Sequence, residues 1–212
     1  MCTPLTFAIL FLAGSVSAAL AQVGPASLPA RDAHEGLLVA ADPYQDAARY
    51  RIRFGKKNPY EAGILAIEVF FRNDNDKPIR LDLQSIRLLI APPGAERQRL
   101  IPLTVEHVVD RILNKGGPNP SLPRGRVPIP GRGPKPGHSK EWNELETALR
   151  AAALEMDILP PRSSVHGFLF FDVNHHYDLL AHARLYLPDL KFMHNNQPLL
   201  FFELELATTA PR

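Results

Sequence analysis

The chain has 212 residues, with 24 lysines and arginines against 22 aspartates and glutamates and a formal net charge of +2. A hydrophobic fraction of 45% and a charged fraction of 22% exclude wholesale disorder, and the near-neutral balance excludes a globally basic nucleic-acid-binding protein. Proline is the outlier, because 21 prolines are about twice the ordinary share.

The N-terminus has the pattern of a secretory signal peptide. No charged side chain precedes Arg31, residues 5–16 form an apolar run, and Ala19-Leu20-Ala21 places small residues where a signal peptidase reads them. We therefore expect residues 1–21 to be removed and the protein to be exported, to the periplasm or the extracellular space. The alternative is an uncleaved N-terminal membrane anchor, because the uncharged run exceeds the length that spans a bilayer.

Export would leave the mature chain without cysteine, since the single cysteine is Cys2. This excludes disulfides, zinc-thiolate sites and thiol nucleophiles in the mature protein. Residues 22–35 are rich in proline, alanine and polar residues and are predicted to be an N-terminal tether. A single domain is predicted from residue 36 to residue 212.

The first elements of this domain are predicted from short local patterns. Residues 36–41 are an apolar run that predicts a strand. Asp42-Pro43 resembles a helix start, because an acidic cap is followed by proline at the first helical position, and we expect a short helix to end at Gly55.

A run of strands is predicted next. Residues 64–72 are dominated by β-branched and aromatic side chains, and residues 79–84 alternate between apolar and polar. Between them, residues 73–76 read Asn-Asp-Asn-Asp, which predicts a tight hairpin turn. Calcium binding is the alternative for this acidic turn, but the glycine and the distant glutamate of an EF-hand loop are missing. Residues 85–90 predict a further strand.

The pattern becomes helical from residue 104. Thr104 can cap a helix with valine, isoleucine and leucine at helical spacing, and Ser139 can cap a second helix whose apolar face carries Trp142, Leu145, Leu149, Ala152, Ala153 and Met156. Of the 22 residues from 116 to 137, 6 are glycine and 7 are proline, so no regular element is expected there. We predict a helical and Pro/Gly-rich insertion over about residues 100–160.

Strands resume at residues 165–173, 183–187 and 199–206. The count is about seven strands joined by short turns, which predicts a mainly β protein with an antiparallel, immunoglobulin-like β-sandwich and a two-helix insertion. The expected core residues are Leu65, Ile67, Val69, Phe71, Leu169, Phe171, Phe202 and Leu204.

The predicted strands resemble a broad class of bacterial secreted immunoglobulin-like domains of unknown function. The resemblance rests on two features. The first is a hydrophobic strand that ends in an asparagine turn, over residues 64–73, and is followed by Pro78-Ile79. The second is an edge in which prolines, at Leu159-Pro160-Pro161, precede a glycine and an aromatic strand, at Gly167-Phe168-Leu169-Phe170. It covers residues 36–90 and 158–206, and the insertion departs from it. It implies an extracytoplasmic binding or structural module and carries no catalytic residues over to this chain.

Histidines cluster in the C-terminal part of the sequence. Five of the eight lie at positions 166, 175, 176, 182 and 194. The loop 174–182 could offer imidazole and carboxylate ligands to a metal, or His176 and Asp178 could act as a catalytic pair. The alternative is a polar loop whose histidines are solvated, because the sequence offers no third ligand at a spacing typical of a metal site. We expect no cofactor.

Charge is segregated in the insertion. Seven cations and no acid lie between Arg111 and Lys140. The candidate contact residues in this basic arm are Arg124, Arg126, Arg132 and Lys135. Their partner would be an acidic protein, an anionic envelope polymer or a membrane surface. Nucleic acid is not expected, because no aromatic residues are interleaved for base stacking. The alternative is a solvated linker.

Two functions therefore stay open from sequence. The first is an exported, non-catalytic binding or scaffolding domain of the cell envelope or extracellular space. The second is a metal-assisted hydrolase built on a β-sandwich, with the histidine loop 174–182 as its site.

Overall fold

The structure is a computed structural model, which describes residues 28–114 and 139–207. The predicted signal peptide and the basic arm therefore lie outside the described residues. The helices are α1 (Ala47–Phe54), η2 (Pro59–Ala62), α2 (Val105–Leu113), α3 (Lys140–Ala152) and η3 (Tyr177–His182). The strands are β1 (Ala30–His34), β2 (Leu37–Pro43), β3 (Ile64–Asn73), β4 (Ile79–Leu81), β5 (Arg87–Ile90), β6 (Gln98–Leu100), β7 (Ile158–Leu159), β8 (Ser163–Asp172), β9 (Ala183–Leu187), β10 (Leu190–Phe192) and β11 (Phe202–Glu205).

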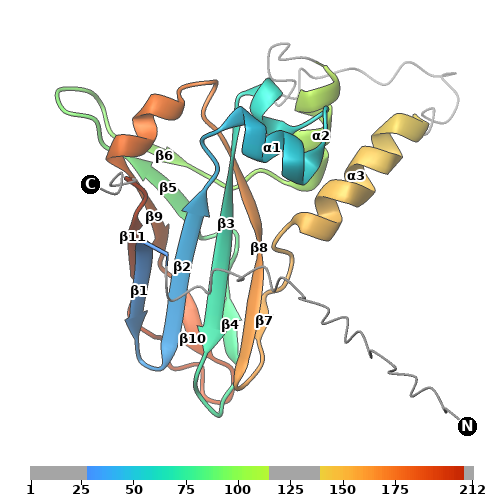
Figure 1. Cartoon of the computed structure of the whole chain (residues 1–212). Coiled ribbons are helices and arrows are strands. Elements are labelled where there is room, and N and C mark those ends of the chain that lie inside the picture. Colours follow the sequence, from blue (N-terminus) through green and yellow to red (C-terminus); the bar gives the residue numbers. More distant parts are fainter. Residues whose placement is uncertain (1–27, 115–138, 208–212) are drawn as a thin grey trace, which may run out of the picture.

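The strands form three sheets. Sheet A has the order β1-β2-β3-β8, sheet B the order β10-β4-β7 and sheet C the order β11-β9-β5-β6. Every pairing between these strands is antiparallel. Figure 1 looks onto sheet A, with sheets B and C behind it. The prediction of a mainly β protein with antiparallel sheets is confirmed.

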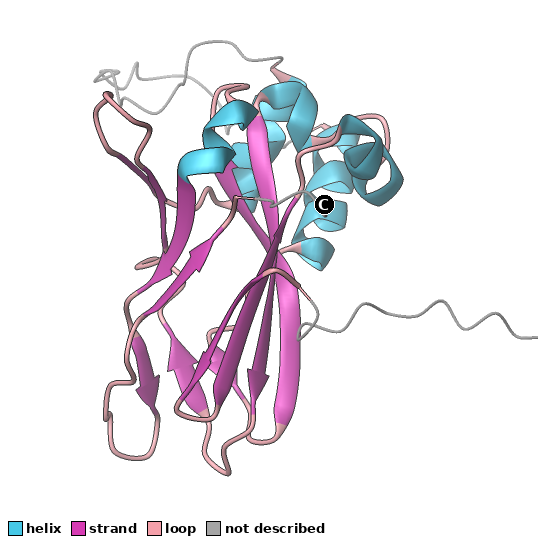
Figure 2. Cartoon of the chain, turned by 60° about the vertical axis from the view of Figure 1, so that its left-hand side comes forward, coloured by secondary structure: helices cyan, strands magenta, loops and turns pink. Residues whose placement is uncertain are grey.

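Sheet A packs against other elements on both of its faces. Its inner face packs against sheets B and C in one hydrophobic core, and its outer face packs against the helices in a second core. Figure 2 shows the helices gathered at one end of the strands. This explains why the middle of β8 is apolar at consecutive positions, since Phe168 and Phe170 face the helices while Leu169 and Phe171 face the other sheets. The eight predicted core residues are all buried in the first core.

The free edge of β8 is closed by the two ends of the helical insertion. The amide of Leu103, just before α2, donates to the Phe170 carbonyl at 2.7 Å, and the amide of Leu154, just after α3, donates to the Phe168 carbonyl at 3.0 Å. Gly167 permits this approach, because a Cβ there would lie 2.7 Å from the Leu154 Cα. These two hydrogen bonds occupy the β8 edge of sheet A at Phe168 and Phe170, where another strand could otherwise pair.

The predicted hairpin at residues 73–76 is wrong. Strand β3 pairs with β2 and β8, whereas β4 pairs with β10 and β7, so the turn crosses from one sheet to another. Asn73 is fully buried at this crossing and donates to the carbonyls of Lys77 at 2.9 Å and Pro160 at 3.0 Å. The turn is therefore tied to the connection between β7 and β8 rather than to a hairpin partner.

Three boundaries differ from expectation. The tether prediction is wrong for residues 30–34, which form β1 and pair with β2 through a turn in which Glu35 and Gly36 have φ of 49° and 72°. Asp42-Pro43 ends β2 instead of starting a helix, and Asp46 caps α1 by accepting from the Ala48 amide at 2.8 Å. The end of α1 at Gly55 is confirmed.

Both helix starts in the insertion are confirmed. Thr104 caps α2 and Ser139 caps α3, each accepting a hydrogen bond from the third residue along. Helix α3 ends at Ala152, so Met156 lies beyond it and is 46% exposed, contrary to its expected place on the apolar face. In the described part of the chain, no helix has both the length and the apolar character that a membrane span requires.

Candidate functional site

The histidine loop connects β8 to β9 and contains η3. Two consecutive residues, Asn174 and His175, have left-handed backbone with φ of 47° and 67°. His175 sits directly over Gly63, where a Cβ would come within 2.9 Å of the imidazole ring. Asp172 accepts the Asn174 amide at 3.1 Å and Arg111 at 3.3 Å, which fixes the start of the loop. These contacts hold the loop against neighbouring parts of the protein, at Gly63 and Arg111.

The structure does not bring the five clustered histidines together as a metal site. His166 lies on the outer face of sheet A, where its Nδ1 is 3.1 Å from a Glu68 oxygen and its ring stacks on Phe70. Within residues 28–114 and 139–207, no group of three or more histidine, cysteine or acidic side chains could hold a metal ion. No hydrogen bond joins His176 to Asp178 in the same part of the chain. The four basic residues Arg124, Arg126, Arg132 and Lys135 lie outside the described residues.

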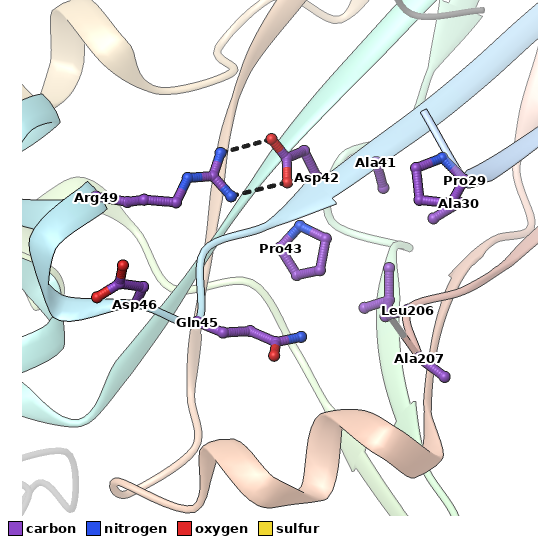
Figure 3. Close-up of a pocket in the computed structure, with 10 residues that line it drawn as sticks. All are labelled: Pro29, Ala30, Ala41, Asp42, Pro43, Gln45, Asp46, Arg49, Leu206 and Ala207. Carbon is purple, nitrogen blue, oxygen red and sulfur yellow. Dashed lines mark hydrogen bonds and ion pairs between the residues drawn. The ribbon is translucent and has the colours of Figure 1, made fainter. Parts of the chain in front are cut away.

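A second arrangement surrounds the pocket in Figure 3, between the ends of β1 and β2, α1 and the residues after β11. Arg49 holds the Asp42 carboxylate through two hydrogen bonds of 2.7 and 3.1 Å, and its guanidinium lies 3.9 Å from the centre of the Tyr44 ring. The hydrogen bond to Asp42 raises the pKa of Arg49, and burial followed by the nearby Glu68 carboxylate raises the pKa of Tyr44. Tyr44 donates to Glu68 at 3.1 Å.

This pocket is a poor candidate for ligand binding or catalysis. Its volume is about 160 Å³, below the roughly 300–1,000 Å³ of small-molecule sites. Its lining contains no hydroxyl or thiol nucleophile, and two of its charged groups, Asp42 and Arg49, neutralise each other in the ion pair that Figure 3 shows. We interpret it as a packing gap beside a structural ion pair.

The better candidate lies on the outer face of sheet C. The register places Arg99 of β6, Leu89 of β5, Arg184 of β9 and Glu205 of β11 in one row across the four strands. A groove of about 480 Å³ runs over this row. We call it the sheet C groove; its lining residues are Leu89, Ile90, Ala91, Arg97, Gln98, Arg99, Ala181, His182, Ala183, Arg184, Glu203, Glu205 and Ala207. The β5–β6 hairpin projects beside η3 at the upper left of Figure 1.

The two walls of the sheet C groove differ in charge. Arg184 donates to Glu203 at 2.9 Å and to Glu205 at 3.0 Å, and the hydrogen bond to Glu203 raises the pKa of the guanidinium. On the opposite wall, Arg97 and Arg99 are exposed, and their side chains make no hydrogen bond or ion pair with any other described residue. The groove therefore has one wall whose charges pair with one another and leave one excess negative charge, and one wall with two available cations.

Apolar side chains lie on the same face. Phe201 is 52% exposed and contacts the Tyr186 ring with a centroid distance of 5.5 Å. Ile101 is 61% exposed and lies immediately after β6, two residues beyond Arg99. Arginine, tyrosine and phenylalanine are residue types that carry much of the binding energy at protein interfaces.

The sequence did not identify this groove. Strand β6 has three residues and no hydrophobic alternation, so it carries no pattern of its own. The available signal was Pro93-Gly94, a turn dipeptide between the apolar run that ends at Ile90 and the arginines that follow. Comparison of the chain with protein-family models, with curated proteins and with solved structures found no match. The candidate site therefore rests on its geometry alone.

Proposed function

We propose that the protein is an exported, non-catalytic binding or scaffolding domain of the cell envelope or extracellular space. The observation that carries the proposal is the outer face of sheet C, where a groove is lined by two arginine side chains without partners among the described residues and where Phe201, beside the Tyr186 ring, is exposed. Exposed apolar area beside available guanidinium groups is typical of a protein-binding surface.

Export is the second part of the proposal. It is supported by the apolar run at residues 5–16 and by Ala19-Leu20-Ala21. We also propose that the fold is an immunoglobulin-like sandwich. The support for this is the packing of sheet A against sheets B and C around a shared core. The alternative, a metal-assisted hydrolase at residues 174–182, has no structural observation in its favour.

Site-directed photo-cross-linking in cells that produce the full chain tests the binding function. A photoreactive amino acid replaces Phe201 or Arg99 on sheet C, and Ile52 in a matched control. Ile52 is 87% exposed on α1 and does not line the sheet C groove. We expect a cross-linked product of discrete mass from the two sheet C positions and none from Ile52. Equal labelling at all three positions, or none at any, would contradict a binding role for this face.

A further inference from the structure

We infer that the sheet C groove binds an extended acidic segment of a partner protein, with Arg97 and Arg99 as the groups that hold its carboxylates. This inference rests on the proposed binding function and names the chemistry of the partner. It starts from the two exposed guanidinium groups that line the groove and have no ion-pair partner in the described chain.

The spacing of the two arginines favours an extended segment. Arg99 lies in β6 and Arg97 immediately precedes that strand, and both side chains line the groove. Residues two apart in extended backbone are separated by about 6.6 Å along the chain. Alternate side chains of any extended peptide have the same spacing. A segment with acidic residues at every second position can therefore present one carboxylate to each guanidinium.

The other wall of the groove shows the same pairing within the chain. Glu203 and Glu205 are alternate residues of β11, and both bind Arg184 on the neighbouring strand β9. Alternating glutamates on an extended strand thus already satisfy an arginine on this face. Both carboxylates are held by Arg184, so they form ion pairs within their own wall and none with Arg97 or Arg99.

The apolar part of the groove favours an acidic protein segment over a partner that offers only negative charge. Apolar atoms of Leu89, Ala91 and Ala181 contribute to its lining, and Phe201 is exposed on the same face. Partial exclusion of water strengthens a guanidinium–carboxylate pair compared with one on an open surface. An acidic peptide can fill this space with its own apolar side chains between the carboxylates, whereas a flat membrane surface does not enter a groove.

The test uses the full chain and a labelled peptide in which glutamate alternates with valine and threonine. Arg97→Gln with Arg99→Gln is the test variant. Arg51→Gln with Lys56→Gln is the control, because it removes the same charge from an exposed region outside the groove. A third variant changes Arg124, Arg126, Arg132 and Lys135 to Ser, which separates the groove from the basic arm. Fluorescence anisotropy measures the affinity.

We expect the test variant to lose at least about tenfold in affinity and the other two variants to stay within about twofold. A matched peptide with glutamine for glutamate should bind no variant. Equal affinity of the test and control variants would overturn the inference, as would loss of binding only in the basic-arm variant. Retention on anionic vesicles without peptide binding, or a dimer that the test variant abolishes, would overturn the assignment of an acidic partner segment.

The outcome separates this inference from the proposed function. Cross-linking at Phe201 together with arginine-independent peptide binding would leave the binding function in place and remove the acidic partner. Arginine-dependent peptide binding without any cross-linked product in cells would retain the groove chemistry and remove the proposed function.

Discussion

The hydroxyl of Tyr50 offers the sharpest test of how the structure is held together. Strand β2 ends at Pro43, opposite Ile67, so the preceding part of β3 has no strand partner on that side. The Tyr50 hydroxyl takes that place: it accepts from the Ala66 amide at 2.7 Å and donates to the Ile64 carbonyl at 3.3 Å. Tyr50 is fully buried, so water cannot replace it.

Tyr50→Phe should therefore leave a buried amide without an acceptor. Such an orphaned group costs about 1–3 kcal/mol, and we expect a loss near 2 kcal/mol in the free energy of unfolding. Since 1 kcal/mol shifts the melting temperature of a chain of this size by about 2–4 °C, the shift should be about 4–8 °C. Urea unfolding measured by circular dichroism gives the free energy directly.

The matched control is Tyr186→Phe. Tyr186 is half-buried on sheet C and its hydroxyl makes no hydrogen bond with another described residue. Its loss should stay below about 0.5 kcal/mol, the range of a neutral surface change. A Tyr50→Phe loss in that same range would refute the idea that the hydroxyl completes the edge of β3.

The same tyrosine predicts behaviour at alkaline pH. Burial raises the pKa of Tyr50 above its ordinary value, so the fold favours the protonated form. The stability from this preference is fully present below about pH 10 and is lost as pH rises above it. Tyr50→Phe should flatten the alkaline decline in stability without removing it, because burial also raises the pKa of Tyr177.

Four further outcomes are expected. Leu204→Ala, at a core position 1% exposed, should cost about 2–5 kcal/mol, and a cost below about 0.5 kcal/mol would place it on the wrong face. Gly167→Ala should cost about 1–3 kcal/mol in urea unfolding, because the new methyl meets the backbone of Leu154; an unchanged midpoint would mean that this contact yields freely. A hydrogen bond from the backbone amide of Glu106 lowers the pKa of its carboxyl most, followed by a hydrogen bond from the Thr104 hydroxyl. The free energy of unfolding of wild type should therefore exceed that of Glu106→Gln above about pH 4.3, and this difference should shrink as the pH falls below that value. Replacing residues 116–137 by a short linker should keep the melting temperature within a few degrees, since loop length costs only about 0.6 kcal/mol per doubling; a large drop would assign them a packing role.

Elements with strong local signals were predictable. The strand at residues 64–72 and the two helices of the insertion were identified because hydrophobic periodicity and a capping side chain coincide within a few residues. Of the eleven described strands, about seven were predicted. Strands β1, β6, β7 and β10 were missed, since each is short and becomes a strand only through pairing with a neighbour. The turn at Asn73 was misjudged because the decisive partner, the Pro160 carbonyl, lies 87 residues away.

The candidate site was less predictable than the fold. Histidines that are close in sequence end at separate places, with His166 on a sheet face and His175 packed over Gly63. The sheet C groove draws residues from four strands and η3, so its shape depends on strand order. Neither Arg97 nor Arg99 belongs to a sequence motif. The sequence does not show that their guanidinium groups lack an ion-pair partner, because the two glutamates on the same face pair with Arg184 instead.

The anchoring of Leu103 and Leu154 on β8 has a consequence for how this fold can diversify. The two carbonyls that receive these amides belong to residues two positions apart, which places the exit and return of the chain about 6.6 Å from each other. The insertion between Leu103 and Leu154 therefore leaves the sheet and returns to it at neighbouring positions of β8. Its replacement need not change the order of the strands. A segment inserted in its place would have to cover Phe168 and Phe170 with apolar side chains. Its length, structure and binding specificity could otherwise differ from those of the present insertion.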